Sequence, residues 1–151
     1  MIKLGKLTDY AIAVMGQLAH ATADASSSAR ALSDKTGVPE PTVAKVLKLL
    51  AKGDLVTSER GTNGGYRLAK LAAEISIGEI ITAMEGPVAI VACIEGQEES
   101  CNMFGTCPTK SNWHRVNAAI KSALDGIKLT EMMTAPAPKN YLVKDIHVHR
   151  A

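Results

Sequence analysis

Apolar side chains in the first third of the chain recur at the spacing of a helix. One set lies three or four positions apart and predicts an amphipathic helix over residues 8–21. Its members are Leu7, Ala11, Val14 and Leu18. A polar stretch follows, in which Ser27 or Ser28 is placed to cap a second helix over 29–36.

The next apolar set predicts a helix over residues 41–52. Pro41 falls in its first turn, where a missing N–H breaks no helical hydrogen bond. The apolar members are Val43, Val46, Leu47 and Leu50. Gly37 and Val38 form a tight turn before this helix. Short helices joined in this way, with basic and polar residues left over on the second, are typical of a helix-turn-helix.

A β-hairpin is expected directly after this pair of helices. Residues 55–58 form a short strand, 61–65 a glycine-rich turn and 66–68 a returning strand. A hairpin in this position of the chain indicates a winged helix.

The rest of the chain is predicted to hold further helices with an irregular segment between them. Ser76 and Glu79 are spaced as a capping box for a helix that ends at Gly86. Residues 93–110 lack periodicity and contain every cysteine, so we expect a loop shaped by something other than an apolar core. A long helix follows, and its continuous apolar stripe is expected to face a partner helix. The stripe consists of Trp113, Val116, Ile120, Leu124 and Ile127.

Composition supports a helical fold, because 46% of the residues are hydrophobic and only 3% are aromatic. We therefore expect a mainly α protein, made of a winged helix-turn-helix domain with a small β-hairpin wing and a long C-terminal dimerisation helix. The predicted division is a DNA-binding domain over 1–87, a cysteine-containing loop over 88–110, the dimerisation helix over 111–133 and a polar tail over 134–151.

Charge and hydropathy bear on the partner and the compartment. Residues 1–70 hold ten Lys and Arg against six Asp and Glu, which weakly favours a polyanionic partner. The apolar stretch near the N-terminus is interrupted by Asp9 and Gln17, unlike a signal peptide. The longest apolar run, 87–94, is too short to cross a bilayer. We expect a cytoplasmic protein with no membrane contact.

The polar residues of the predicted helix-turn-helix and wing are candidates for DNA contact. Residues off the apolar face of the second helix meet base edges, and an arginine at the tip of a glycine-rich wing enters the minor groove. The expected contacts are Ser28, Thr42, Lys45, Lys48, Arg60 and Gly64. A helix-turn-helix also occurs in proteins that never touch DNA, but the charged wing favours DNA binding.

The three cysteines fall within fifteen residues, at Cys93, Cys101 and Cys107. Soft thiolates at such density favour iron–sulfur or zinc binding over hard cations. Structural zinc sites usually contain a closer Cys-x2–4-Cys pair, which this sequence lacks. A redox-active thiol set and plain buried cysteines are the alternatives.

Several motifs together make the chain resemble the Rrf2 family of bacterial regulators. The motifs are Leu7-Thr8-Asp9-Tyr10-Ala11, Arg60-Gly61-x-x-Gly64-Gly65-Tyr66-Arg67-Leu68, Ile77-Gly78-Glu79-Ile80, Glu85-Gly86-Pro87 and the trailing cysteines. The resemblance covers about residues 1–133 and is specific, because the motifs keep the family's order and spacing. It is strongest with the iron–sulfur subgroup, which includes IscR-like, NsrR-like and SUF-operon regulators.

The resemblance implies a homodimer whose long helices cross. Each recognition helix would lie in a major groove of a roughly palindromic double-stranded operator. IscR-like members read a base with an acidic residue where this chain has Ala44, so the operator sequence does not carry over.

The resemblance also implies an iron–sulfur cofactor, which takes a fourth protein ligand beside the cysteines or leaves that site vacant. The histidine of IscR-like members is replaced by Lys110, and His114 lies further along the predicted helix. Asp9 matches the aspartate that in NsrR-like members reaches the cluster of the partner subunit. A simpler role for Asp9 is to cap the first helix. We expect a 4Fe-4S cluster in preference to 2Fe-2S.

We therefore predict a DNA-binding repressor, and not an enzyme, that senses cluster status, iron, redox state or nitric oxide and controls SUF assembly genes. One alternative is a cluster-free DNA-binding regulator whose cysteines form a thiol–disulfide switch. Another is an iron–sulfur electron carrier, although such carriers normally use four cysteines. A thiol enzyme is disfavoured, because no His/Asp partner motif is visible.

Overall fold

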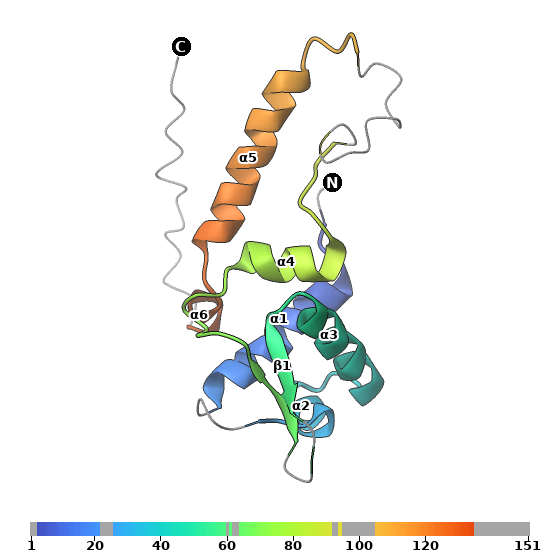
Figure 1. The fold of residues 1–151 in the computed structure, drawn as a ribbon, viewed down its shortest axis with the longest axis vertical. Helices are drawn as coiled ribbons and strands as arrows, with labels where there is room; N and C mark the ends of the chain where they lie inside the picture. Colours follow the sequence, from blue (N-terminus) through green and yellow to red (C-terminus); the bar gives the residue numbers. More distant parts are fainter. Residues whose placement is uncertain are drawn as a thin grey trace.

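The computed structural model of the chain contains a winged-helix unit and one long helix that projects from it (Figure 1). The structure describes residues 3–21, 26–59, 61, 64–91, 94 and 105–134. In chain order the elements are α1 (Lys6–His20), α2 (Ala29–Thr36), α3 (Glu40–Lys52), β1 (Val56–Glu59), β2 (Gly65–Leu68), α4 (Ile77–Glu85), α5 (Lys110–Gly126) and α6 (Leu129–Met133). The expected fold class, mainly helical with a small hairpin, is confirmed.

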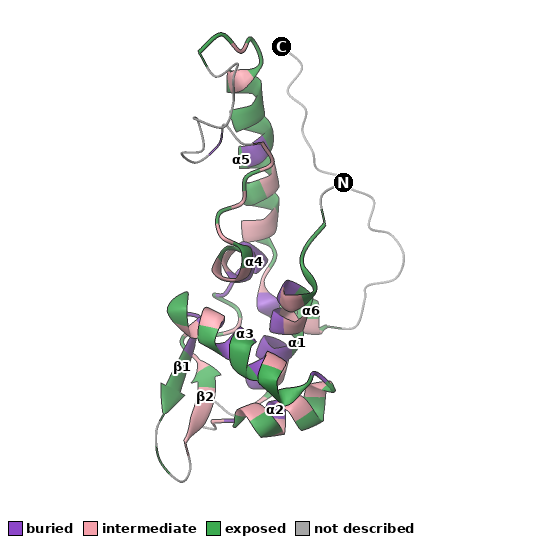
Figure 2. Ribbon diagram, turned by 90° about the vertical axis from the view of Figure 1, so that its right-hand side faces the viewer, coloured by how far each residue is buried: buried purple, intermediate pink, exposed green. Residues whose placement is uncertain are grey.

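The apolar core lies where α1, α3 and α4 meet. In Figure 2, buried and exposed positions alternate along the helices of the winged-helix unit. The four apolar positions expected on α3 are all fully buried. They pack against the apolar face of α1, which includes Val14 and Met15. Burial of each such side chain stabilises the fold by about 1.5–3 kcal/mol.

The helix-turn-helix follows its expected capping residues. Ser28 precedes α2, and its hydroxyl oxygen accepts a hydrogen bond from the Ala31 backbone N–H at 3.1 Å. Gly37 ends α2 in the left-handed conformation, with φ of 72°, which glycine adopts without strain. The next helix, α3, begins one residue earlier than expected, at Glu40.

The start of α1 corrects the expected helix bounds and one expected role of Asp9. The helix runs over Lys6–His20, where 8–21 was expected, and its N-cap is Gly5. Asp9 therefore lies within the first turn and does not cap the helix. Gly5 has no side chain with which to cap the helix, and its own N–H is bound by a residue from α4, as described below.

The wing is the β1–β2 hairpin. Its strands are antiparallel, with Val56 opposite Leu68 and Glu59 opposite Gly65. Tyr66 also pairs on its other side with Ser27, through two backbone hydrogen bonds of 2.9 Å. A Cβ at Gly65 would lie 2.8 Å from the Ser27 backbone, so only glycine fits between the wing and the start of α2.

The expected capping box at the start of α4 is confirmed. The Ser76 hydroxyl accepts from the Glu79 N–H, and the Glu79 carboxylate accepts from the Ser76 N–H at 2.8 Å. Gly78 lies in the first turn of α4 and faces Asp125 of α5. A Cβ at Gly78 would collide with the Asp125 carboxylate. The glycine of the Ile-Gly-Glu-Ile motif thus lets α4 and α5 pack together.

The single helix expected over 111–133 is two helices in the structure. The first, α5, ends at Gly126, and the chain then turns back so that α6 packs against α1. The turn is fixed by hydrogen bonds of 2.9 Å from the Ile77 N–H to the Ile127 carbonyl and from the Leu129 N–H to the Ile75 carbonyl. Leu129 is fully buried, so its burial in the core outweighs continuation of the helix.

None of the helices in the described ranges combines the length and the apolar character needed to cross a membrane.

Candidate DNA interface and cysteine segment

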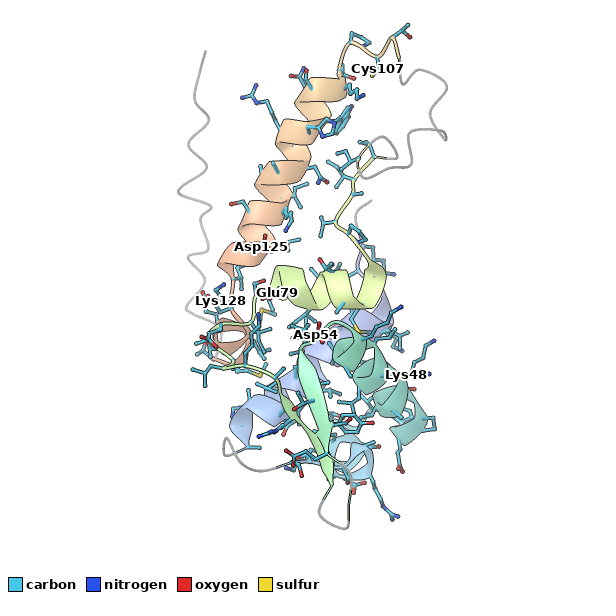
Figure 3. All side chains as sticks on the ribbon, in the orientation of Figure 1. Lys48, Asp54, Glu79, Cys107, Asp125 and Lys128 are labelled. Carbon is cyan, nitrogen blue, oxygen red and sulfur yellow. The ribbon has the colours of Figure 1, made fainter. Side chains whose placement is uncertain are left out.

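The solvent-facing side of α3 carries the residues expected to read DNA. Lys45 and Lys48 are exposed and Thr42 is partly exposed, whereas the apolar face of the same helix is buried. The Lys48 side chain points away from the body of the molecule (Figure 3). Lys52 extends this row by one further turn and is also exposed. We call Lys45, Lys48 and Lys52 the lysine stripe; its i, i+3, i+7 spacing is readable in the sequence, but Lys52 was not among the expected contacts.

A hollow lies between the wing and the start of α2. Ser28 and Gly64, both expected DNA contacts, line it together with Glu59 and Gly61. Ser28 is exposed at the N-terminus of α2, where free backbone N–H groups and the helix dipole favour an anion. Arg60, the expected minor-groove residue, lies outside the described residues.

The wing also holds a charge pair that was not predicted from the sequence. The Arg67 guanidinium lies 3.0 Å from the Glu59 carboxylate, and both side chains are nearly half exposed. The two residues sit on opposite strands, since Arg67 pairs with Thr57 and Glu59 with Gly65. The register of the hairpin would have revealed this diagonal pair.

Cys107 is the described member of the cysteine set, and it lies just before α5. It is half-buried, and its sulfur is 3.4 Å from the Thr109 hydroxyl oxygen. Hydrogen bonds from the side chain and backbone of Thr109, followed by the nearby Lys110, lower the pKa of the Cys107 thiol. This environment favours the thiolate, which is the form that binds metal.

The remaining cysteines, Cys93 and Cys101, lie outside the described residues. Within the described part of the chain, no three His, Cys, Asp or Glu side chains gather closely enough to hold a metal ion. The chemistry of the Cys107 environment fits an iron–sulfur ligand. His114, the other ligand considered, is exposed on α5.

Asp9 is exposed in the first turn of α1, and its side chain makes no hydrogen bond or salt bridge to any described residue. It lies in the winged-helix unit, whereas Cys107 lies at the end of α5 that is farther from that unit (Figures 1 and 3). The structure therefore does not bring Asp9 and Cys107 of one chain together.

The residue before Asp9 joins two of the sequence motifs. Thr8 is fully buried, and its hydroxyl donates a hydrogen bond to the Glu85 carboxylate. The same carboxylate oxygen accepts from the Gly5 N–H at 2.6 Å. A carboxylate from the last residue of α4 thus caps α1, where the helix dipole favours negative charge. Sequence spacing gave no sign of this contact, because the partners are 77 residues apart.

Comparison with known proteins identifies the family. The model of the Rrf2 family, described as iron-dependent transcriptional regulators, matches residues 4–135. The transcriptional regulator IscR of Aliivibrio salmonicida is 31% identical over 132 residues, which cover 87% of this chain and 77% of that protein. The transcriptional repressor NsrR of Streptomyces coelicolor is 29% identical, with 89% of this chain and 90% of that protein covered.

Solved structures agree with these matches. The global cysteine regulator CymR of B. subtilis has a TM-score of 0.68 at 26% identity, covering 88% of this chain and 97% of that one. IscR of T. potens has a TM-score of 0.63 at 29% identity, covering 90% and 94%. The family that matches is one of transcriptional regulators rather than enzymes. The chain therefore belongs to the Rrf2 family and is a winged-helix DNA-binding transcriptional regulator.

Proposed function

We propose that this regulator is a homodimeric repressor whose DNA affinity depends on a bound iron–sulfur cluster. Cys93, Cys101 and Cys107 of one chain and Asp9 of the other would hold a 4Fe-4S cluster, with 2Fe-2S as the less favoured form. The genes it would control are those of SUF cluster assembly, with iron supply, redox state or nitric oxide as the signal.

The observation that carries this proposal is the environment of Cys107. Hydrogen bonds from Thr109 lower the pKa of the thiol at the start of α5, so a ligand-competent thiolate forms more readily than in an isolated cysteine. When bound, the cluster would supply iron–ligand bonds that oxygen, nitric oxide or iron loss can break. A carboxylate is a hard ligand for such iron, so the Asp9 bond is expected to be the most labile.

The position of Asp9 supports a ligand shared between subunits. Its carboxylate is exposed on α1, and α1 is remote from Cys107 of the same chain (Figures 1 and 3). A partner chain is the simplest source of the second half of the site. Asp9 would then tie α1 to the partner's cysteines, and release of Asp9 would free α1 and shift the recognition helix that packs against it.

The α5 helix supports dimerisation. Trp113 and Val116 are 39% and 44% exposed on it, and large apolar side chains in a row are commonly covered by a partner. A two-fold dimer would present two copies of α3 to successive major grooves about 34–36 Å apart. The lysine stripe would then follow the phosphates beside each groove.

Anaerobic purification tests the cofactor directly. We expect a brown protein with iron and sulfide in equal amounts and an absorption band in the visible region, and a Cys107→Ala variant that has lost both. A colourless wild-type protein without iron and sulfide would overturn the proposal.

Mixed dimers test the shared ligand. A chain carrying Asp9→Ala and a chain carrying Cys107→Ala each lack one ligand, so each homodimer should lose its cluster. If Asp9 acts across the dimer, co-expression of the two chains restores one complete site per dimer, and about half of the wild-type iron returns to the mixed dimer. If Asp9 bound its own chain's cluster, mixing the chains would restore nothing. An Asp9→Ala homodimer that keeps its cluster and its cluster-dependent DNA affinity would contradict the role of Asp9 outright.

The lowered pKa of the Cys107 thiol also favours a second candidate, a cluster-free thiol–disulfide switch, because thiolates are the reactive species in disulfide exchange. A colourless protein whose DNA affinity changes on oxidation by diamide and recovers with dithiothreitol would establish this alternative in place of the first.

A further inference from the structure

Asn117 is the one buried residue of α5, whose other positions are exposed or half-buried. The α5 helix has one buried position part-way along its length (Figure 2), and this position is Asn117, which is only 7% exposed. A buried polar side chain must find hydrogen-bond partners, because burying it unpaired costs about 1–3 kcal/mol. The partners of Asn117 therefore show what this part of α5 is built to hold.

Both ends of the Asn117 amide bind the backbone of a single segment. We call residues 86–91, which leave α4 and run beside α5 in Figure 1, the connector. The side-chain NH2 of Asn117 donates to the Val88 carbonyl at 2.9 Å, and its side-chain oxygen accepts from the Ile90 N–H at 3.2 Å. An asparagine amide in this arrangement offers the donor and acceptor that a neighbouring strand would offer.

The contact between Asn117 and the connector lies where the segment that contains the cysteines begins and ends. The connector leads into Cys93, and Asn117 comes ten residues after Cys107, so the contact closes the segment that contains every cysteine. On its other side the connector begins at Gly86, directly after Glu85, which caps α1 through Gly5 and Thr8. One continuous path of contacts therefore joins α5, the connector, the end of α4 and the start of α1.

We propose that Asn117 is the positioning residue that couples the cysteine segment to the DNA-binding unit. This inference rests on the proposed function and names the contact through which that function is transmitted. A displacement of the cysteine segment is passed to α4 and α1 because the connector is held against α5 and cannot yield independently. Without the Asn117 amide, the connector absorbs much of the displacement, and the winged helix responds less to it, through the direct packing of α5 on α4 alone.

Two substitutions separate this role from general support of the fold. Asn117→Asp keeps the shape and the acceptor for the Ile90 N–H, but it loses the donor and sets a negative oxygen against the Val88 carbonyl. Asn117→Leu keeps the volume and removes both hydrogen bonds. Asn112→Asp is the matched control, because Asn112 is exposed on the same helix.

The first readout tests the contact in the cluster-free protein. Hydrogen exchange at the Ile90 amide should be slow in wild type and in Asn112→Asp, and faster in Asn117→Leu. An Ile90 amide that exchanges equally fast in wild type and Asn117→Leu would overturn the proposal, because the contact would then not hold the connector.

The deciding readout is the ratio of operator affinities of the cluster-loaded and cluster-free forms, with iron per chain measured in the same samples. We expect both Asn117 variants to retain iron while this ratio moves toward one by about five-fold or more, the lower end of common allosteric couplings. A purely structural role would weaken both forms alike and leave the ratio unchanged, which would overturn the proposal. If Asn117→Leu does not fold, Asn117→Asp alone decides it.

The same experiment separates failure of this inference from failure of the proposed function. A wild-type protein with no iron, or with equal affinities in the two forms, refutes the proposed function and the inference with it. A wild-type ratio far from one that persists in the Asn117 variants refutes only the role of Asn117.

Discussion

The winged-helix unit and the α5 helix are stabilised in different ways. The unit is held by fully buried side chains such as Leu47, Leu50 and Ile80. The described part of α5 buries only Asn117 and leaves Trp113 and Val116 exposed. The first region is held by its own apolar surface, whereas α5 contributes Leu124 to that surface and is otherwise held by the Asn117 hydrogen bonds and, in the proposed dimer, by a partner chain. A helix held in this way is suited to change its surroundings when a ligand is gained or lost.

The largest expected effect breaks the winged-helix unit. Leu50→Ala removes a fully buried side chain of α3 and should lower the free energy of unfolding by about 2–5 kcal/mol. Val116→Ala is the control on α5 and should change the unfolding of the cluster-free chain by less than about 0.5 kcal/mol at concentrations below dimerisation. Urea unfolding followed by circular dichroism measures both. Equal losses would show that α5 belongs to the same core.

The apolar stripe of α5 should matter for association instead. Trp113→Ala is expected to weaken dimerisation by about 2 kcal/mol, or roughly 30-fold, as is typical of a large aromatic residue at an interface. Arg115→Ala, exposed on the same helix but off the stripe, is the control. Analytical ultracentrifugation over a dilution series gives the dissociation constants. A monomer at every concentration in the wild type would contradict the dimer itself.

The contact between α4 and α1 is expected to have an intermediate effect on stability. Glu85→Gln removes the negative charge that caps α1 and weakens two hydrogen bonds, which should cost about 1–2 kcal/mol of unfolding free energy. Glu74→Gln is the control, because its carboxylate accepts only an exposed hydrogen bond from the Leu71 N–H. If thermal unfolding is equally affected by the two changes, the buried partner Thr8 does not give Glu85 a special role.

The lysine stripe can be tested without changing the apolar core of the winged-helix unit or the contacts of α5. Lys48→Ala should weaken operator binding by about 1 kcal/mol and reduce the slope of log affinity against log salt by about one. Lys121→Ala should leave both unchanged, because Lys121 lies on α5 rather than on the recognition helix and is paired with Asp125. Fluorescence anisotropy at several salt concentrations measures the slope. Identical slopes for wild type and Lys48→Ala would remove Lys48 from the interface.

The smallest expected effect is a pH dependence at Glu79. Burial raises the pKa of Glu79, but hydrogen bonds from Lys70 and Ser76 outweigh it, so the pKa lies below the ordinary 4.5. A lowered pKa in the folded state stabilises the protein above pH 4.5, and this contribution is lost as the pH falls through the folded value. Glu79→Gln should therefore destabilise the protein by less than about 1 kcal/mol at pH 7. Unfolding measured below pH 4 should show a smaller difference; a difference that grows on acidification would give the opposite sign.

Local signals in the sequence predicted most of the winged-helix unit. Ser28, Gly37 and the Ser76–Glu79 capping box act within a few residues, so their spacing alone places the helix ends. The end of α5 was missed because Ile127 fits the apolar stripe. The competing burial of Leu129 depends on the distant α1, and periodicity carries no information on it.

The same difference between local signals and long-range contacts applies to the candidate sites. Thr42, Lys45 and Lys48 could be placed on the outer face of α3 because the apolar positions of that helix define the inner face. The contacts made by Thr8 with Glu85 and by Asn117 with the connector join residues far apart in the chain, so no spacing rule reveals them. Arg60, Cys93 and Cys101 lie outside the described residues and stay predictions.

The central claim is that a bound cluster sets the affinity of this regulator for DNA. The most direct measurement is an anaerobic operator titration of one preparation, before and after iron is removed by a chelator, with Cys107→Ala titrated beside it. We predict a several-fold change in affinity on iron removal, and a Cys107→Ala protein that behaves like the iron-free form throughout. An affinity that is the same before and after removal of a demonstrated cluster would contradict the account.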